Sequence, residues 1–109
     1  MPTTYKLLGA STPGTTGATL YTVPSSTQAI ASSLIITNIS ASAANFTVAI
    51  KTSSVAPTID ANYISYQTAV PGNDSVIMTL GLSLSSSYVV QVSGSTSKVA
   101  FNLFGVELT

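Results

Sequence analysis

The feature that most constrains this chain is a two-residue alternation of apolar and other side chains, interrupted by turn signals. In residues 45–52, the apolar side chains of Phe46, Val48 and Ile50 alternate with polar or small ones. Successive side chains of a β-strand point to opposite faces, so this pattern predicts a strand with one face in the core. Turn signals recur about every 8 to 15 residues, which is typical of a β-sandwich or barrel.

The same pattern predicts eight strands and no helix. The predicted strands cover residues 5–10, 19–23, 29–39, 45–52, 62–69, 75–80, 87–93 and 98–108. Together they predict an all-β fold, an antiparallel β-sandwich of about eight strands, for which a compact jelly roll is one arrangement. Residues 1–109 are expected to form this single domain, with residues 1–17 as an N-terminal arm that contains the first strand and its loop.

Two connections have definite sequence signals. Pro71, Gly72, Asn73 and Asp74 predict a type II turn, in which the proline sets φ at the first central position and the glycine takes a positive φ at the second. Residues 83–86 are rich in serine and are expected to link two strands.

Charged residues are scarce. They make up 6% of the chain and the net charge is zero, whereas about 25% is typical of soluble domains. The six are Lys6, Lys51, Asp60, Asp74, Lys98 and Glu107. A neutral surface favours association, and a partner can cover it without burying an unpaired charge. The alternative is an ordinary monomer whose serine and threonine side chains face water.

Four of the predicted strands carry apolar residues on both faces, although no helices exist to cover an outer face. This indicates an interface with other subunits, and the residues expected to contribute are Ile35, Ile77, Val89 and Phe104. The pattern leaves open which face of each strand lies in the core. Singly exposed valine or isoleucine side chains are also ordinary on protein surfaces.

Residue types suited to catalysis are nearly missing. Histidine and cysteine are absent, and the one candidate carboxylate pair, Asp60 and Asp74, falls in two predicted loops. We therefore expect no enzyme activity and no cofactor. Asp60, Asn62, Asn73 and Asp74 carry oxygen ligands of the kind calcium takes, but without EF-hand spacing they are expected to be solvated, and no metal site is predicted.

Neither nucleic acid nor a membrane is an expected partner. Three lysines without arginine provide no basic surface for phosphate groups. The sequence also has no apolar run of membrane-spanning length and no secretory signal.

Five tyrosines could provide a platform for sugars. Tyr63 and Tyr66 are the nearest pair, but residues three apart on a regular strand point to opposite faces, so they are not expected to share a platform. A carbohydrate-binding host-adhesion module remains an alternative function, which an aromatic cluster on one face would favour.

Several segments resemble a family of small tailed-bacteriophage virion proteins over residues 18–109. They are ATLYTVP (18–24), ASSLIITNIS (31–40), NFTVAI (45–50), VIMTLGL (76–82) and VAFNLFG (99–105). Members of that family begin with a segment of the TLYTVP type and end in a strand of the FxxFG type. The resemblance implies a β-sandwich component of the virion, either a capsid decoration (cement) protein or a tail or fibre accessory protein, with no catalytic or metal-binding residues.

The expected function is therefore that of a non-catalytic capsid decoration protein that stabilises the shell by packing against the major capsid protein or other virion subunits. We expect a homo-oligomer located in the virion and assembled in the host cytoplasm. The structural alternative is a tail, collar or fibre accessory protein.

Overall fold

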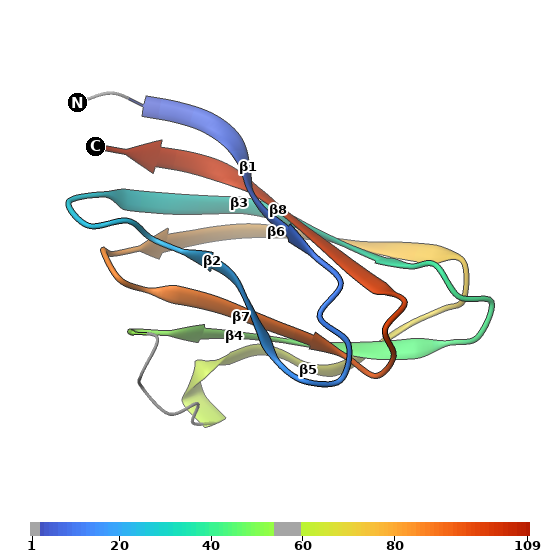
Figure 1. The fold of residues 1–109 in the computed structure, drawn as a ribbon. Helices are drawn as coiled ribbons and strands as arrows, with labels where there is room; N and C mark the ends of the chain where they lie inside the picture. Colours follow the sequence, from blue (N-terminus) through green and yellow to red (C-terminus); the bar gives the residue numbers. More distant parts are fainter. Residues whose placement is uncertain (1–2, 54–59) are drawn as a thin grey trace.

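In the computed structural model, which describes residues 3–53 and 60–109, the chain forms eight β-strands (Figure 1). The strands are β1 (Thr3–Ser11), β2 (Ala18–Thr22), β3 (Gln28–Asn38), β4 (Ala44–Lys51), β5 (Tyr63–Val70), β6 (Asp74–Leu84), β7 (Val89–Gly94) and β8 (Val99–Leu108). A 3-10 turn, η1 (Asp60–Asn62), precedes β5. No α-helix occurs within these two described stretches.

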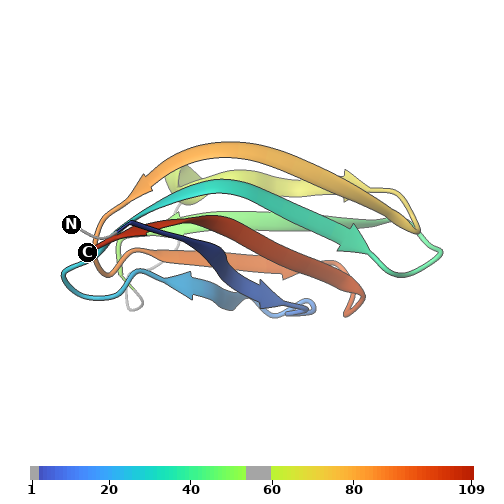
Figure 2. The same cartoon turned by 90° about the horizontal axis from the view of Figure 1, so that it is seen from above.

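The strands form two four-stranded antiparallel sheets, with the orders β1-β8-β3-β6 and β2-β7-β4-β5 (Figures 1 and 2). The first strand pairs with the last, the second with the seventh, the third with the sixth and the fourth with the fifth. This nesting is what a long two-stranded ribbon produces when it is rolled into two layers, and it defines a jelly roll. The predicted antiparallel sandwich is confirmed.

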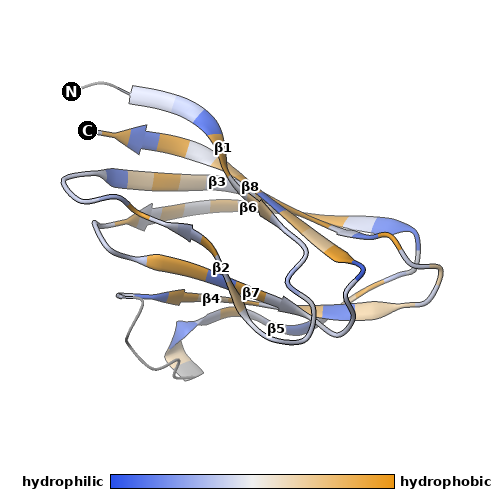
Figure 3. Ribbon diagram, viewed as in Figure 1, coloured by the Kyte–Doolittle hydropathy of each residue, from blue (hydrophilic) through white to orange (hydrophobic). Residues whose placement is uncertain are grey.

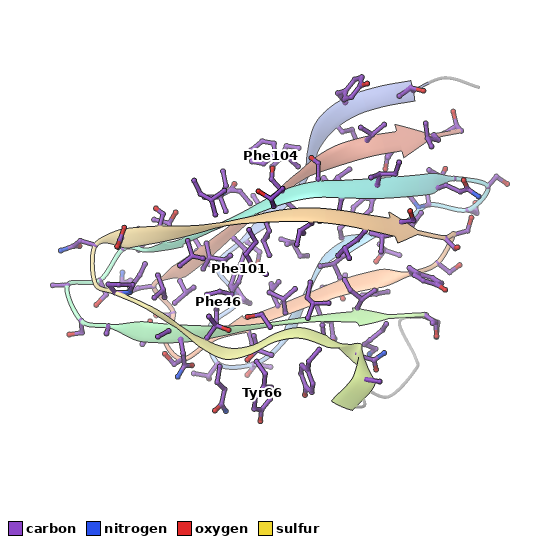
Figure 4. The ribbon with its side chains drawn as sticks, turned by 180° about the vertical axis from the view of Figure 1, so that it is seen from behind. Phe46, Tyr66, Phe101 and Phe104 are labelled. Atoms are coloured by element: carbon purple, nitrogen blue, oxygen red, sulfur yellow. The ribbon has the colours of Figure 1, made fainter. Side chains whose placement is uncertain are left out.

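The core lies between the two sheets and consists almost entirely of aliphatic side chains around two phenylalanines. Phe46 on β4 and Phe101 on β8 are at most 1% exposed, and their rings meet edge to face with centroids 6.2 Å apart (Figure 4). Hydrophobic residues recur along the strands of both sheets because alternate positions point into this core (Figure 3).

Strand β6 is longer than its sequence pattern predicts. It continues through Gly81 to Leu84 and pairs with the start of β3, whereas residues 83–86 were expected to be a linker. The inward side chains of Leu82 and Leu84 pack against or within the core, which favours continued pairing over a turn. A Cβ at Gly81 would meet nothing within 4 Å, so this glycine marks neither a turn nor a close contact.

The turn between β5 and β6 occurs where it was predicted, but its backbone differs from the predicted one. Asn73, with a φ of 53°, takes the left-handed conformation that was expected of Gly72. Gly72 is needed for another reason, because a Cβ there would lie 2.1 Å from the carbonyl oxygen of Ala41. The β3–β4 and β5–β6 connections therefore touch at this end of the sandwich.

Asn38 ties these two connections together. Its side chain is fully buried, and its Nδ2 donates to the carbonyl oxygens of Ser42 (2.8 Å) and Pro71 (3.3 Å). Its Oδ1 accepts a hydrogen bond from the backbone amide of Ser40. A buried amide satisfied on both sides in this way fixes the geometry of the loops it joins.

Candidate interaction surfaces

The outer face of the β1-β8-β3-β6 sheet, called here the docking face, is an apolar surface built in cross-strand register. Tyr5 on β1 lies opposite Val106 on β8, which lies opposite Ile30 on β3. One row further along, Leu7 lies opposite Phe104. Four of these five side chains rank among the exposed large hydrophobic residues of the chain, from Tyr5 at 81% to Phe104 at 37%.

The docking face carries no charged side chain at any outward position of its four strands, all of which the structure describes. The charged residues of these strands point to the other side. Lys6 pairs in register with Gly105, which is buried, and Asp74 pairs with Asn38, whose side chain enters the interior. Glu107 contacts Tyr21 of the opposite sheet.

Three of the four predicted interface residues lie on this face. Ile77, 68% exposed, pairs directly with the half-buried Ile35 across β6 and β3. Phe104 lies on the same face, on the far side of the molecule from Tyr66 (Figure 4). Val89 does not join them: it lies on β7 in the other sheet and has no exposed surface, so within this fold its side chain is not available to a partner.

The sequence pattern missed three residues of the docking face: Tyr5, Leu7 and Ile30. The apolar Leu7 and Leu8 are adjacent, and alternation alone does not say which of them points outward. In the structure, Leu7 points outward in register with the exposed Phe104, and Leu8 packs against the core.

At one end of the sandwich, a small polar cluster joins the two sheets. The Lys6 Nζ lies 2.8 Å from Glu107 Oε1, and the Tyr21 hydroxyl donates to Glu107 Oε2 at 2.5 Å.

The hydrogen bonds from Lys6 and Tyr21 hold the pKa of the Glu107 carboxyl below its usual range. Burial, together with the nearby carboxylate, raises the pKa of the Tyr21 hydroxyl well above its usual range. Both groups are therefore held in one protonation state near neutral pH, which suits a structural tie between β1, β8 and β2 rather than proton transfer.

The oxygen-bearing loop residues are not brought together. Asp60 lies in η1 before β5 and Asp74 begins β6 after it, so the two residues lie beyond opposite ends of β5. Among the described residues, no group of three acidic, histidine or cysteine side chains could hold a metal ion. The described part of the chain also contains no helix that is long and apolar enough to cross a membrane.

The outer face of the β2-β7-β4-β5 sheet has a different character, because it contains a hollow. The hollow has a volume of about 140 Å³ and crosses the sheet from the start of β2 to β5. Its lining residues are Gly17, Thr47, Ala49, Tyr63, Gln91, Val92 and Ser93. The register explains its shape: the short side chains of Ala49 and Ser93 form the floor in the middle of the sheet, and Tyr63 opposite Ala49 forms a wall.

Tyr66, which does not line the hollow, packs against Tyr63, so the prediction that the two tyrosines point to opposite faces is wrong. Their rings meet edge to face with centroids 4.8 Å apart. The β4–β5 pairing is irregular, because three residues of β5, 63 to 65, lie opposite only two residues of β4, 48 and 49. The extra residue is a β-bulge, and it breaks the two-residue alternation between the two tyrosines.

Sequence comparison finds no relative, since no protein-family model and no curated protein matches the chain. Comparison of folds does find similar solved structures. A chain from the structure of infectious bursal disease virus, Gx strain, matches 97% of this chain with a TM-score of 0.50 and 9% identity. A chain from the Gt strain matches 97% of it with a TM-score of 0.48 and 10% identity.

The matched region is only 30% of the Gx chain and 28% of the Gt chain, so this protein spans less than a third of either. At 9% identity, the Gx likeness shows a shared fold: this jelly roll also occurs as part of a longer chain in a virus structure. No tailed-bacteriophage family is matched, so the resemblance to that family stays a prediction.

Proposed function

We propose that this protein is a non-catalytic structural component of a virion, and specifically a capsid decoration (cement) protein of a tailed bacteriophage. In this role, its docking face packs against the major capsid protein or other virion subunits, and copies of the chain associate with one another. Each copy that binds only the assembled shell lowers the free energy of that shell by mass action, and a symmetric lattice repeats the effect at every equivalent site.

The observation that carries this proposal is the docking face, which combines exposed apolar side chains with a complete lack of charge. A partner that covers Tyr5, Leu7, Ile77 and Phe104 removes apolar surface from water, which is favourable in proportion to the area. Such a partner desolvates no charge, and the desolvation of an unpaired charge is what most often makes an interface costly.

The size of the docking face is close to what a specific interface needs. Four strands spaced about 4.8 Å apart, over the ten residues of β8, give an area of about 600 Å². A standard interface takes about 800 Å² from each partner. The docking face, together with a few residues of the neighbouring connections at its rim, therefore has about the area that one partner contributes to a standard interface.

The fold comparison supports a place in the virion, because the similar chain belongs to a virus structure. The jelly roll is also one of the architectures that viral capsid proteins use repeatedly. The sequence resemblance supports the finer assignment to tailed phages.

Location in the particle is the decisive experiment. Virions of the encoding virus are dissociated, capsids and tails are separated, and each fraction is analysed by mass spectrometry. The purified protein is also added to expanded capsids that lack it, and the particles are imaged at subunit resolution. We expect the chain in the capsid fraction, bound through the docking face.

Recovery in the tail fraction would instead support the second candidate, a tail, collar or fibre accessory protein. A protein that stays monomeric at high concentration and binds neither expanded capsids nor tails would refute the structural role.

A further inference from the structure

We propose that the hollow on the outer face of the β2-β7-β4-β5 sheet is a binding site for a neutral pyranose sugar. This would be a second activity of the protein, located on the sheet that faces away from the docking face (Figure 4). It does not depend on the docking face being an interface.

The hollow has the size of a site for one sugar ring. Its volume of about 140 Å³ is close to the roughly 150 Å³ of an enclosed cavity that binds benzene, so this open hollow accommodates the face of one six-membered ring while the ring substituents project into solvent. It is open on one side, as a site for a terminal or internal sugar of a longer chain must be. Its floor is low because Ala49 and Ser93 carry short side chains on adjacent strands.

The wall of the hollow provides an aromatic surface. Tyr63 lines the hollow, and Tyr66, 60% exposed, braces the Tyr63 ring edge to face. An aromatic ring has a negative face, which attracts polarised C–H groups such as those on the apolar side of a pyranose. The contact between the two rings also limits the rotation of Tyr63, so less entropy is lost when a ligand binds.

The floor of the hollow also provides two hydroxyl groups. The Thr47 Oγ1 accepts a hydrogen bond from the Gln67 amide at 3.0 Å, which fixes its position and leaves the hydroxyl hydrogen to donate. The Ser93 hydroxyl lies on the neighbouring strand, in register with Thr47. A largely apolar wall facing a few positioned polar groups is the usual composition of a small-molecule site.

Charge decides which class of sugar fits. None of the seven lining residues is charged, and Lys51, two residues beyond Ala49 on β4, is buried and does not line the hollow, so no lining cation is present to pair with a carboxylate, sulfate or phosphate. An anionic sugar would lose its hydration without compensation, and a neutral sugar would not. A shallow site of this kind is expected to bind single sugars with millimolar Kd, and many copies on one particle would raise the avidity.

The test is a nuclear magnetic resonance titration of the full chain, labelled with nitrogen-15. The probes are methyl α-D-glucopyranoside, methyl α-D-mannopyranoside and methyl β-D-galactopyranoside, with D-glucuronate as the anionic comparison, each up to about 100 mM so that a millimolar Kd saturates. We expect at least one neutral sugar to shift the backbone amide signals of Thr47, Ala49, Gln91 and Ser93 in a saturable way.

Two variants locate the site, and a third is the matched control. Tyr66→Ala removes the brace of the wall, and Ser93→Leu fills the floor; each is expected to weaken binding at least tenfold while the spectrum keeps the dispersion of a folded protein. Tyr5→Ala removes an even more exposed tyrosine from the opposite face and is expected to leave binding unchanged.

Three results would overturn the proposal: no shift with any of the three neutral sugars, equal loss of binding in Tyr5→Ala and Tyr66→Ala, or binding of glucuronate alone. Since the titration uses the isolated protein, its outcome is independent of whether the protein binds capsids.

Discussion

The substitution Ile77→Asp tests the docking face directly, because it places a charge on an otherwise uncharged surface. Ile77 is 68% exposed on β6, an edge strand of its sheet, so the folded monomer makes little use of its side chain. We expect the free energy of unfolding to fall by about 1 kcal/mol, mainly from the poor strand preference of aspartate.

The effect on association is expected to be larger than the effect on stability. Fully burying an isoleucine side chain contributes about 1.5 to 3 kcal/mol, so a partner that covers the exposed two thirds of Ile77 gains about 1 to 2 kcal/mol. Burying an unpaired aspartate adds a penalty of several kcal/mol. A combined loss above about 3 kcal/mol raises the Kd more than about 100-fold.

The assay is co-sedimentation of the purified variant with capsids that lack the protein, over a range of concentrations, alongside urea unfolding of the free variant. The matched control is Tyr66→Asp, which introduces the same charge at a residue of similar exposure, 60%, on an edge strand of the other sheet. Capsid binding by Ile77→Asp that equals that of the wild type, or a loss shared equally by Tyr66→Asp, would show that the docking face is not the interface.

Three further predictions concern stability, each measured by urea unfolding. Phe101→Ala is expected to cost about 3 to 5 kcal/mol, and a double-mutant cycle with Phe46 should give a coupling of about 0.5 to 1.5 kcal/mol; zero coupling would contradict the observed ring contact. The pKa of Glu107 is lower in the folded state, so the ionised carboxylate contributes to the free energy of unfolding above the unfolded pKa of about 4.3, and this contribution is lost as the pH falls through the folded pKa. Glu107→Gln should therefore reduce the loss of stability at acid pH, and a stability profile identical to that of the wild type would contradict the role of this carboxylate. Gly72→Ala is expected to destabilise by about 1 to 3 kcal/mol, because its Cβ meets a backbone oxygen, whereas Gly81→Ala in open space should stabilise by about 0.5 kcal/mol; equal effects would show that the contact at Gly72 relaxes freely.

The strands could be predicted from the sequence because their signal is local. Alternation and turn residues act over a few positions, and all eight predicted strands correspond to observed ones. The end of β6 was missed because Gly81 resembles a turn residue, whereas its pairing with β3 depends on a segment about fifty residues away.

The surfaces could be predicted only in part, because they depend on which side of each strand meets the opposite sheet. Val89 and Phe104 both lie in strands that are apolar on both faces, so the sequence pattern does not indicate which of the two is buried. The structure buries Val89 and exposes Phe104. The hollow was missed for a related reason: the bulge that brings Tyr63 beside Tyr66 arises from the pairing of β5 with β4, which local alternation does not record.

The nested pairing of the strands also has a consequence for the order in which the protein is made. Since β1 pairs with β8, and β8 also lies between β1 and β3, the first sheet is incomplete until the last strand has been synthesised. Strands that are far apart in the sequence pair slowly, and until they have paired, their exposed edges are prone to association with other chains. The scarcity of charge that suits the finished surface would leave the unfinished chain with little electrostatic protection against aggregation, so rapid completion and capture by a partner would benefit it.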